Sequence, residues 1–497
     1  MKKVICYFAL SVFVGVFVSL LSGCTVFSST GSYTSNAHSD GEQREVVGVI
    51  EKKQRAYQGV FRNPVIIVHG FLGANLVDSK TDQNVWGEFT GMDGFSISNE
   101  RMRQLAVPML KGVPLSGLVD NTVPAGMLDK VTVKILGVEL TQNAYINLID
   151  VLKTGGYQPE GQPLLPGRNF NTLFQFAYDW RRDLVWNAKK FHQFIEEKRK
   201  YIKKQYKVMY GIPDYDVHFD VIGHSMGGLL TRYYLRYGTA DLPSEGKFAK
   251  LTWAGSKYIE RLIILGTPNA GYLDTLIEMI NGRDIPPFPP ALLGTWVTYY
   301  EMMPVLSRHS VVMKGTKKPI DIFDIETWKK YNWGLADPSQ VENLKILLPD
   351  VKDDNERREI ALDHLGKCLN RAKLFTEVMA QPANPPDGVK LYLVLGNAFK
   401  TTRRAEVDPA TGKLTVTEYA PGDGKVTVAS ALFDRRAGGE WTPFFTSPID
   451  WDSIIQLRAA HMGITTAYPF KDNILFLLNA VPTERQKKEM ENLQLNY

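Results

Sequence analysis

The segment at residues 220–229 constrains the fold of this chain more than any other stretch of the sequence. An apolar run at 219–222 leads into Gly223, Ser225 and Gly227, and a pattern typical of a helix follows. Glycines two residues on either side of a serine leave room for a very tight turn between a strand and a helix. We therefore predict that Ser225 lies on such a turn, at the end of a buried strand.

Further apolar runs place this turn in an α/β fold. Short runs rich in β-branched residues end in turn-forming residues, and helical patterns such as 185–206 separate them. Such runs are typical of parallel strands that are buried on both faces. The alternation predicts a mostly parallel central sheet with helices on both faces, as in the α/β-hydrolase fold. The runs lie at 64–68, 219–222, 262–265 and 389–395.

Two long insertions, at about 74–142 and 272–385, interrupt this alternation and are expected to form caps or lids. The catalytic body, with these insertions, is expected at 48–485, and a polar tail at 486–497. Part of the second insertion is apolar and rich in proline. It fits either a lid that meets lipid or a cap that packs its own small core. Its apolar residues include Ile285, Phe288, Leu292, Leu293, Trp296 and Val297.

The N-terminus carries a targeting pattern. Lys2 and Lys3 precede an apolar run, and small residues then lead to Cys24. The pattern predicts a lipoprotein signal peptide at 1–23, with cleavage before Cys24 and lipidation of that cysteine. A signal anchor or a short transmembrane helix is the alternative, because the apolar run is close to the lower limit for crossing a bilayer.

A lipidated Cys24 would attach the protein to a membrane of the bacterial cell envelope. Thr25 follows the cysteine where an Asp would retain a lipoprotein at the inner membrane, so we expect the outer membrane in a Gram-negative cell. The stretch at 24–47 is rich in Ser, Thr, Gly and Asn, and it predicts a flexible tether between the anchor and the folded body.

Composition excludes several classes of protein. The net charge of +5, from 58 basic and 53 acidic residues, is too small to indicate a nucleic-acid partner. Three cysteines exclude a disulfide framework, and Cys368 is expected to be a buried, inert thiol. No cluster of metal ligands stands out, since the acidic run at 350–356 favours a solvated helix start over a calcium loop. We expect neither a metal nor a cofactor.

The order of a Ser–acid–His triad in this fold limits the choice of base. Only His309, His364 and His461 follow Ser225 in the chain. His461 lies downstream of the last predicted strand and is the expected general base. His309 and His364 fall in the second insertion, where a surface or capping role is expected. His224, beside the nucleophile, is expected to pack and to form hydrogen bonds.

The acid of the triad is predicted to be Asp423. It lies in a turn between Gly422 and Gly424, after a hairpin-like excursion at 400–419 that follows the strand at 389–395. Asp434 is the rival carboxylate, but it lacks the glycine context.

An oxyanion hole completes the expected site. One donor in this fold is the amide that follows the nucleophile, here Met226. The loop at 68–73 follows the first strand and supplies the second candidate, the amide of Phe71. In the expected mechanism His461 takes the proton of Ser225 as the hydroxyl attacks an ester. Asp423 orients the ring, and the acyl-enzyme passes its acyl group to water or to an alcohol.

Several segments resemble the lecithin:cholesterol acyltransferase family, which includes phospholipases and phospholipid:diacylglycerol acyltransferases. The resemblance covers about residues 60–480. It departs from the family pattern at His69, where proline is usual, and at Lys425, where threonine is usual. It implies the same triad and acyl-lipid substrates, and it leaves hydrolysis and acyl transfer both open. The segments that carry it are 63–73, 177–181, 265–271 and 422–426.

Two other functions fit the sequence. A carboxylesterase for small soluble esters would use the same three residues. A non-catalytic lipid-binding or scaffolding lipoprotein of the envelope could have inherited a hydrolase fold, but the intact set of Ser225, Asp423 and His461 weighs against it. The segment at 177–181 is expected to form a structural network beneath the site.

Overall fold

The computed structural model describes residues 52–492, with gaps at 88–96, 129, 136–137, 144, 245–246, 248–249, 285, 306–309 and 439–440, and it gives only the backbone of 130–143. The expected signal peptide, Cys24 and tether lie outside the described residues. Residues 1–57 and 58–497 form separate compact units, and in the first of them residues 52–56 are helical. Among the described helices, none combines the length and apolar character needed to cross a bilayer.

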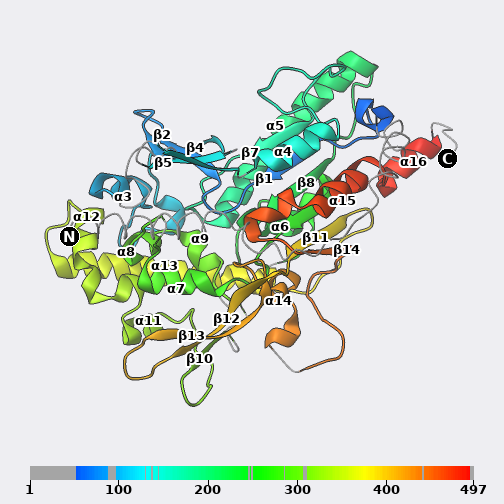
Figure 1. Ribbon diagram of the computed structural model, residues 1–497. Coiled ribbons are helices and arrows are strands. Elements are labelled where there is room, and N and C mark those ends of the chain that lie inside the picture. The colour runs from blue at the N-terminus through cyan, green and yellow to red at the C-terminus, as the bar shows by residue number, and fades with distance from the viewer. Residues whose placement is uncertain are drawn as a thin grey trace, which may run out of the picture. The chain divides into compact units, whose positions relative to one another are not determined.

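A six-stranded sheet organises the second unit, and all of its strand pairs are parallel (Figure 1). The strand order is β14-β11-β9-β8-β1-β7. This confirms the predicted α/β fold. Four strands match the predicted runs, whereas β7 and β14 were not predicted. The strands are β1 (Val65–Val68), β7 (Leu173–Phe176), β8 (Phe219–His224), β9 (Ile259–Leu265), β11 (Lys390–Gly396) and β14 (Ser453–Leu457).

Alternate residues of the strands feed two hydrophobic cores, one on each face of the sheet. In β1, Ile66 and Val68 join the core that includes α5 (Leu184–Tyr210) and α6 (Met226–Tyr237). Val65 and Ile67 join the other core, with α4 (Ile146–Thr154) and α15 (Tyr468–Asn479). Successive side chains of a strand point to opposite faces, so this alternation requires a helical layer on both sides.

The first insertion contributes mostly strands. In it β2 (Ala74–Asp78) pairs antiparallel with both β3 (Asn84–Trp86) and β4 (Thr122–Met127), and α3 (Asn99–Leu105) lies between them in the chain. The antiparallel pair β5 (Lys130–Ile135) and β6 (Val138–Asn143) follows.

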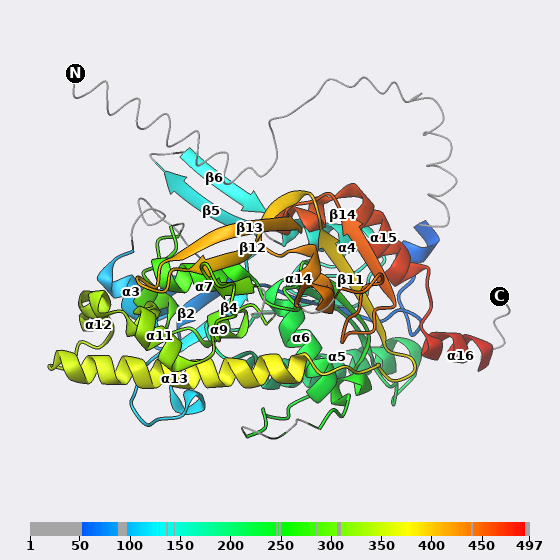
Figure 2. The ribbon, with the colours of Figure 1, turned by 90° about the horizontal axis from the view of Figure 1, so that it is seen from below.

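The second insertion is mainly helical. Figure 2 shows its long helix α13 in yellow, and α9, α11 and α12 all pack against it. The segment expected as a lid or cap is buried: Phe288, Trp296 and Val297 are each at most 3% exposed. It therefore packs a core in this structure, and Ile285 lies outside the described residues. The elements are α7 (Leu273–Asn281), α8 (Pro290–Leu293), α9 (Val297–Glu301), β10 (Val311–Met313), α11 (Ile325–Tyr331), α12 (Val341–Leu347) and α13 (Asp354–Met379).

The predicted excursion after β11 is a hairpin of β12 (Phe399–Val407) and β13 (Leu414–Gly422), with β10 on its edge. The short α14 (Val428–Leu432) follows it, and α16 (Glu484–Asn492) occupies the described part of the polar tail. The 3-10 helices are η1 (Leu115–Gly117), η2 (Ala254–Lys257), η3 (Gly334–Ala336), η4 (Pro338–Gln340), η5 (Arg435–Gly438) and η6 (His461–Thr466).

His364 is a correction to the sequence analysis. A surface or capping role was expected for it, but it is fully buried on α13, and its Nε2 lies 3.2 Å from the Thr295 carbonyl oxygen and 3.4 Å from Cys368 Sγ. Burial lowers its pKa to about 4, so the ring is neutral at neutral pH. The physical reason is that other elements of the insertion cover this face of α13. Cys368 is buried as expected.

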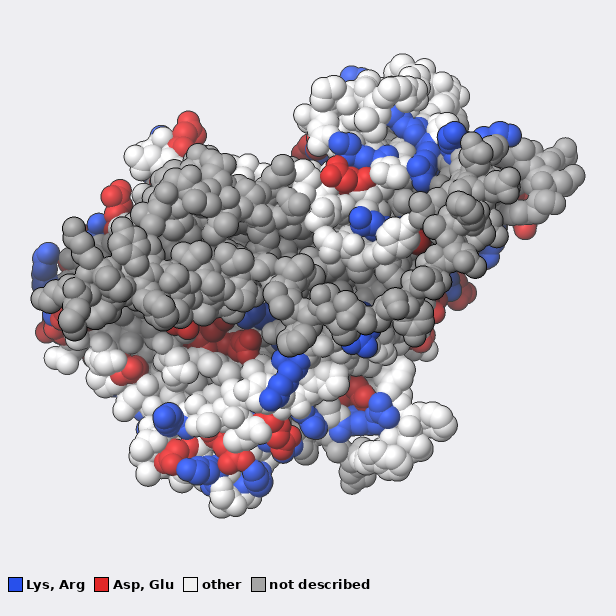
Figure 3. Space-filling view, viewed as in Figure 1, with Lys and Arg blue, Asp and Glu red and all other residues white. Residues whose placement is uncertain are grey.

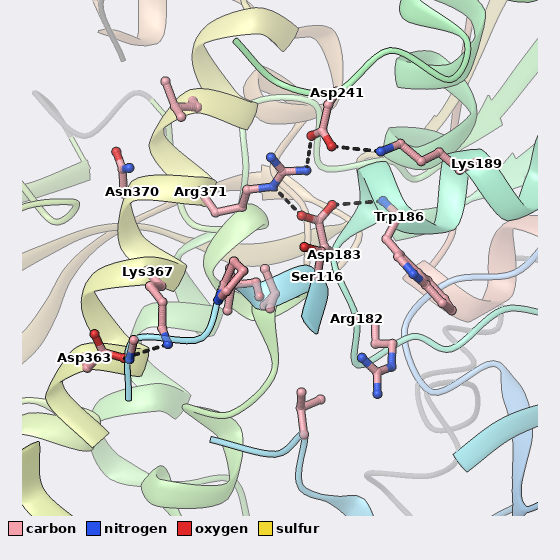
Figure 4. Close-up of a pocket in the computed structure, with 16 residues that line it drawn as sticks. Ser116, Arg182, Asp183, Trp186, Lys189, Asp241, Asp363, Lys367, Asn370 and Arg371 are labelled. Carbon is pink, nitrogen blue, oxygen red and sulfur yellow. Dashed lines mark hydrogen bonds and ion pairs between the residues drawn. The ribbon is translucent and has the colours of Figure 1, made fainter. Parts of the chain in front are cut away.

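Ion pairs fasten α13 to the start of α5. Figure 4 shows Arg371 directed at Asp183 and Asp241, with Lys189 directed at the same Asp241. Asp183 also caps α5, because its Oδ1 accepts the amide of Trp186. These residues line a cavity of about 510 Å³ that none of the predicted site residues lines. The charged residues of this cavity therefore connect the second insertion, through α13, to the helix α5 that covers the central sheet.

A buried carboxyl group lies next to these ion pairs, at the start of α5. Glu301, at the end of α9, is 2% exposed, and its Oε2 accepts the amide of Leu184 at 3.0 Å. Burial, reinforced by the nearby charge of Asp183, raises the pKa of Glu301 well above its usual value. The folded protein therefore keeps this proton to a higher pH than the unfolded chain does.

We predict that Glu301→Gln stabilises the protein at neutral pH. Because the folded pKa is raised, the wild type loses stability as pH rises above the usual value of a glutamate, by about 1.4 kcal/mol per pH unit until the folded pKa is reached. The variant lacks this loss. Urea unfolding at pH 4.5 and pH 7.5 measures it, with the exposed Glu326→Gln as control. Equal pH dependence of wild type and Glu301→Gln would contradict the assignment.

Candidate active site

Ser225 lies on a strained turn between β8 and α6. Its φ of 53° and ψ of −123° are unfavourable for a residue with a side chain. The Ser225 amide donates to the Leu265 carbonyl at 2.8 Å, and the Gly228 amide donates to the Ser225 carbonyl at 3.0 Å. These bonds hold the turn, so that the hydroxyl stands at the carboxyl end of the central strands.

The flanking glycines are needed because the backbones cross closely at this turn. A Cβ on Gly223 would lie 2.8 Å from Thr231 Oγ1 and 2.9 Å from Gly228 Cα. A Cβ on Gly227 would lie 2.3 Å from the carbonyl oxygen of His69. Real Cβ atoms do not approach so closely, so any larger residue would push α6 away from β8 and β1.

The structure brings His461 to Ser225. The ring Nε2 lies 2.9 Å from Ser225 Oγ, and Nδ1 lies 2.7 Å from Asp423 Oδ2. The His461 amide also donates to the Asp423 carbonyl oxygen at 2.9 Å. The ring is positioned at the start of η6, shortly after β14, and its side chain keeps 15% of its surface exposed. The ring is therefore partly accessible from outside the protein.

Asp423 occupies the turn that follows β13. Its Oδ1 accepts the amides of Lys425 at 2.9 Å and Val426 at 2.7 Å, which leaves Oδ2 for His461. Burial opposes ionisation, but the charge and hydrogen bond of His461 and these two amides outweigh it and lower the Asp423 pKa. The rival Asp434 pairs with Arg436 instead. The carboxylate beside the ring is thus charged at neutral pH.

The loop after β1 packs directly on Ser225. A Cβ on Gly70 would lie 2.8 Å from Ser225 Cβ, so the loop can approach only because this residue is glycine. Phe71 comes next, and its ring lies 5.1 Å from that of Trp180 and 4.9 Å from that of Tyr299. These contacts anchor the loop in the core of the insertions.

The two amides expected to form the oxyanion hole lie on this loop and on α6. Met226 is the first residue of α6, and amides in the first turn of a helix have no acceptor within that helix. In the loop, the amide of Gly70 donates to the Tyr145 hydroxyl and that of Gly73 to the Gly70 carbonyl. Neither bond involves Phe71.

His69 fixes the shape of the same loop. Its Nε2 accepts the Tyr178 amide at 3.1 Å, so its Nδ1 carries the proton and donates to the Gly70 carbonyl at 2.7 Å. The Tyr178 hydroxyl donates to the His69 carbonyl at 2.9 Å, and the two rings stack 4.1 Å apart. Burial lowers the pKa of His69 to about 4, against the effect of its backbone hydrogen bonds. The His69 ring is therefore neutral, and both of its nitrogens are hydrogen-bonded.

Tyr145 and His224 form a connection that the sequence analysis missed. The Tyr145 hydroxyl accepts the Gly70 amide at 2.7 Å and lies 3.0 Å from His224 Nδ1, while His224 Nε2 lies 3.3 Å from the His461 carbonyl. Burial lowers the His224 pKa to about 3 and raises that of Tyr145. The neutral His224 therefore accepts from the tyrosine and donates to His461. One hydrogen-bonded chain thus links the loop after β1 to the residue that contacts Ser225.

The segment at 177–181 forms the structural network that was expected. Arg181 is fully buried and pairs with Asp179 at 2.8 Å and with Asp120 at 3.0 Å. Arg182 pairs with the same two carboxylates. The network ties the first insertion to the end of β7, next to Tyr178.

Comparisons with known proteins complete this description. The solved structure of the Tle4–Tli4 complex is similar at a TM-score of 0.51 and 14% identity, covering 83% of this chain and 97% of that chain. Lipase 1 from Pelosinus fermentans matches at a TM-score of 0.31 and 14% identity (85% and 100% covered), and the mature lipase BlEst2 of Bacillus licheniformis at 0.29 and 11% (85% and 94% covered).

At such low sequence identities, structural similarity supports only a shared fold. Of the three TM-scores, only the first exceeds 0.5. No curated protein matches the chain. The family model of lecithin:cholesterol acyltransferase matches residues 128–321, which include the Ser225 turn, and over this part of the chain it agrees with the resemblance found in the sequence.

Proposed function

We propose that this protein is a serine hydrolase or acyltransferase that acts on ester bonds of acyl lipids. The observation that carries the proposal is the continuous hydrogen-bonded chain from Ser225 Oγ through the His461 ring to Asp423 Oδ2. It gives the hydroxyl a base within reach, and it gives the base a carboxylate that orients it and stabilises its protonated form.

The reaction proceeds in two acyl transfers. Ser225 Oγ attacks the ester carbonyl carbon while its proton moves to His461 Nε2, and the amides of Phe71 and Met226 stabilise the oxyanion. The tetrahedral intermediate collapses, and the leaving alcohol takes the proton from His461. Water or an acceptor alcohol then attacks the acyl-enzyme, again losing its proton to His461, and the acid or new ester leaves Ser225.

Two observations support acyl lipids as substrates. The match to the lecithin:cholesterol acyltransferase family covers the nucleophile turn. The predicted lipid anchor at Cys24 would also keep the enzyme near a membrane, although this anchor stays a prediction of the sequence. A carboxylesterase for small esters is the second candidate, since the same triad serves both. The contacts around Ser225 oppose a non-catalytic scaffold, which would have no need to maintain them.

We predict that Ser225→Ala lowers lipid turnover by about a thousandfold or more, because the acyl-enzyme can no longer form. Mass spectrometry of products from a defined phospholipid mixture, with and without an alcohol acceptor, measures the change. Circular dichroism should show an unchanged fold. Lipid turnover that persists in the variant would exclude Ser225 as nucleophile. Wild-type activity confined to short soluble esters would favour the carboxylesterase.

We predict that Tyr145→Phe lowers kcat about tenfold or more while KM changes little, because the Gly70 amide loses its acceptor and the loop beside Ser225 loosens. The matched control is Tyr157→Phe. That tyrosine is equally buried, but its hydroxyl has no hydrogen-bond partner among the described residues. Equal kinetics for the two variants would show that the Tyr145 hydroxyl does not position the site.

A further inference from the structure

An exposed aromatic loop connects α14 to β14, close to the triad in the fold. Trp441 is 81% exposed and Phe444 is 80% exposed, and Phe445 beside them is also exposed. In Figure 3 the protrusion at the lower right is mostly uncharged, with Lys and Arg at its base. Large apolar side chains gathered in one short stretch of a loop, here 441–445, are typical of a surface that contacts a partner.

The loop is held in place by its own hydrogen bonds. The Arg435 amide donates to the Thr446 carbonyl at 2.8 Å, which closes its base. The Arg436 guanidinium pairs with Asp434 and also donates to the carbonyl oxygens of residues 442 and 443. These bonds join the described residues on either side of 439–440, and the exposed aromatic side chains lie on the second side.

A basic cavity lies beside the aromatic loop. It measures about 860 Å³, and Trp441, Arg403, Arg436 and Arg458 are among its lining residues. Arg436 is neutralised by Asp434, and Arg403 lies 3.6 Å from Glu418. No carboxylate of the described chain pairs with Arg458. The guanidinium of Arg458 is thus available to bind an anion in this cavity, which Trp441 also lines.

This cavity shares its wall with the triad. Asn397 lines it and donates its amide to the Leu457 carbonyl at 2.9 Å. The preceding Gly396 lies against Asp423, since a Cβ there would be 2.7 Å from Asp423 Cβ. Arg458 itself stands three residues before His461. A surface that contacts this cavity is therefore brought to the rim of the site.

We propose that this loop and cavity form a docking surface for a bilayer that contains anionic phospholipid. Trp441, Phe444 and Phe445 enter the interface between headgroups and acyl chains, where aromatic side chains are favoured. Arg458 binds a lipid phosphate, because a guanidinium forms strong, paired hydrogen bonds to phosphate oxygens. The inference rests on the proposed function only in that docking would present lipid esters to Ser225.

The test measures docking without catalysis. Full-length protein carrying Ser225→Ala is reconstituted with phosphatidylcholine vesicles whose acyl chains are brominated, with or without phosphatidylglycerol. We expect the brominated lipid to quench part of the tryptophan fluorescence, and we expect the Trp441→Phe variant to lack this quenched part. Phosphatidylglycerol in the vesicles should increase the quenching. The Arg458→Gln variant should lose only the increase in quenching that phosphatidylglycerol causes. All variants share one N-terminal segment, so any anchor there contributes equally.

A second measurement uses protein with Ser225 intact. Replacing Trp441 and Phe444 together by Ala should lower the rate on phosphatidylglycerol vesicles about tenfold, through lost interfacial burial, and leave the rate on a soluble nitrophenyl ester unchanged. The control replaces Tyr468 and Phe476 by Ala, two aromatic residues on α15 that are 67% and 65% exposed, and it should change neither rate.

The proposed docking surface would be wrong if no part of the quenching depended on Trp441. It would also be wrong if the α15 control lost as much activity on vesicles as the loop variant. A protein partner as the true occupant would give the first of these results. If the proposed function alone is wrong, quenching persists while wild-type protein hydrolyses neither substrate. The two failures are therefore distinguishable.

Discussion

The close approach of three backbone segments around Ser225 is the constraint on which the rest of the site depends. Gly70 contacts the serine, and Gly227 contacts the carbonyl of His69. A Cβ on Gly266 would lie 3.2 Å from both Asp423 Oδ2 and His461 Nδ1. Because these glycines have no side chains, the ends of β1, β8 and β9 converge until their loops touch. The Ser225 hydroxyl, the His461 ring and the Asp423 carboxylate can then lie within hydrogen-bond distance of one another on one edge of a parallel sheet.

The neutral histidines around the site follow from the same close packing. His69 and His224 are buried and have pKa values lowered to about 4 and about 3, so neither carries charge at neutral pH. Each uses both ring nitrogens: His69 bonds the backbone of Gly70 and Tyr178, and His224 bonds the Tyr145 hydroxyl and the His461 carbonyl. They hold the loop and the backbone of His461 without adding positive charge beside the His461 ring, which would oppose protonation of that ring.

The sequence predicted those parts of the fold and site that local patterns encode. Continuous apolar runs identified four strands, and the tight turn, the glycine-flanked Asp423 and chain order identified three residues that lie together in the structure. It did not predict β7, whose apolar run is interrupted by Gln175, or β14, an edge strand that is mostly not buried. Tyr145 and the buried His364 were missed because their partners are remote in the chain, and no local pattern marks such contacts.

The most direct test of this account is covalent labelling of the hydroxyl at the strand–helix turn. A fluorophosphonate probe reacts with a serine that an adjacent base activates. Peptide mass spectrometry of the labelled full-length protein should find the adduct on Ser225, and Asp423→Asn should slow its formation at least about a hundredfold because the His461 ring loses its orienting carboxylate. An adduct on another residue, or no adduct on folded protein, would contradict the account.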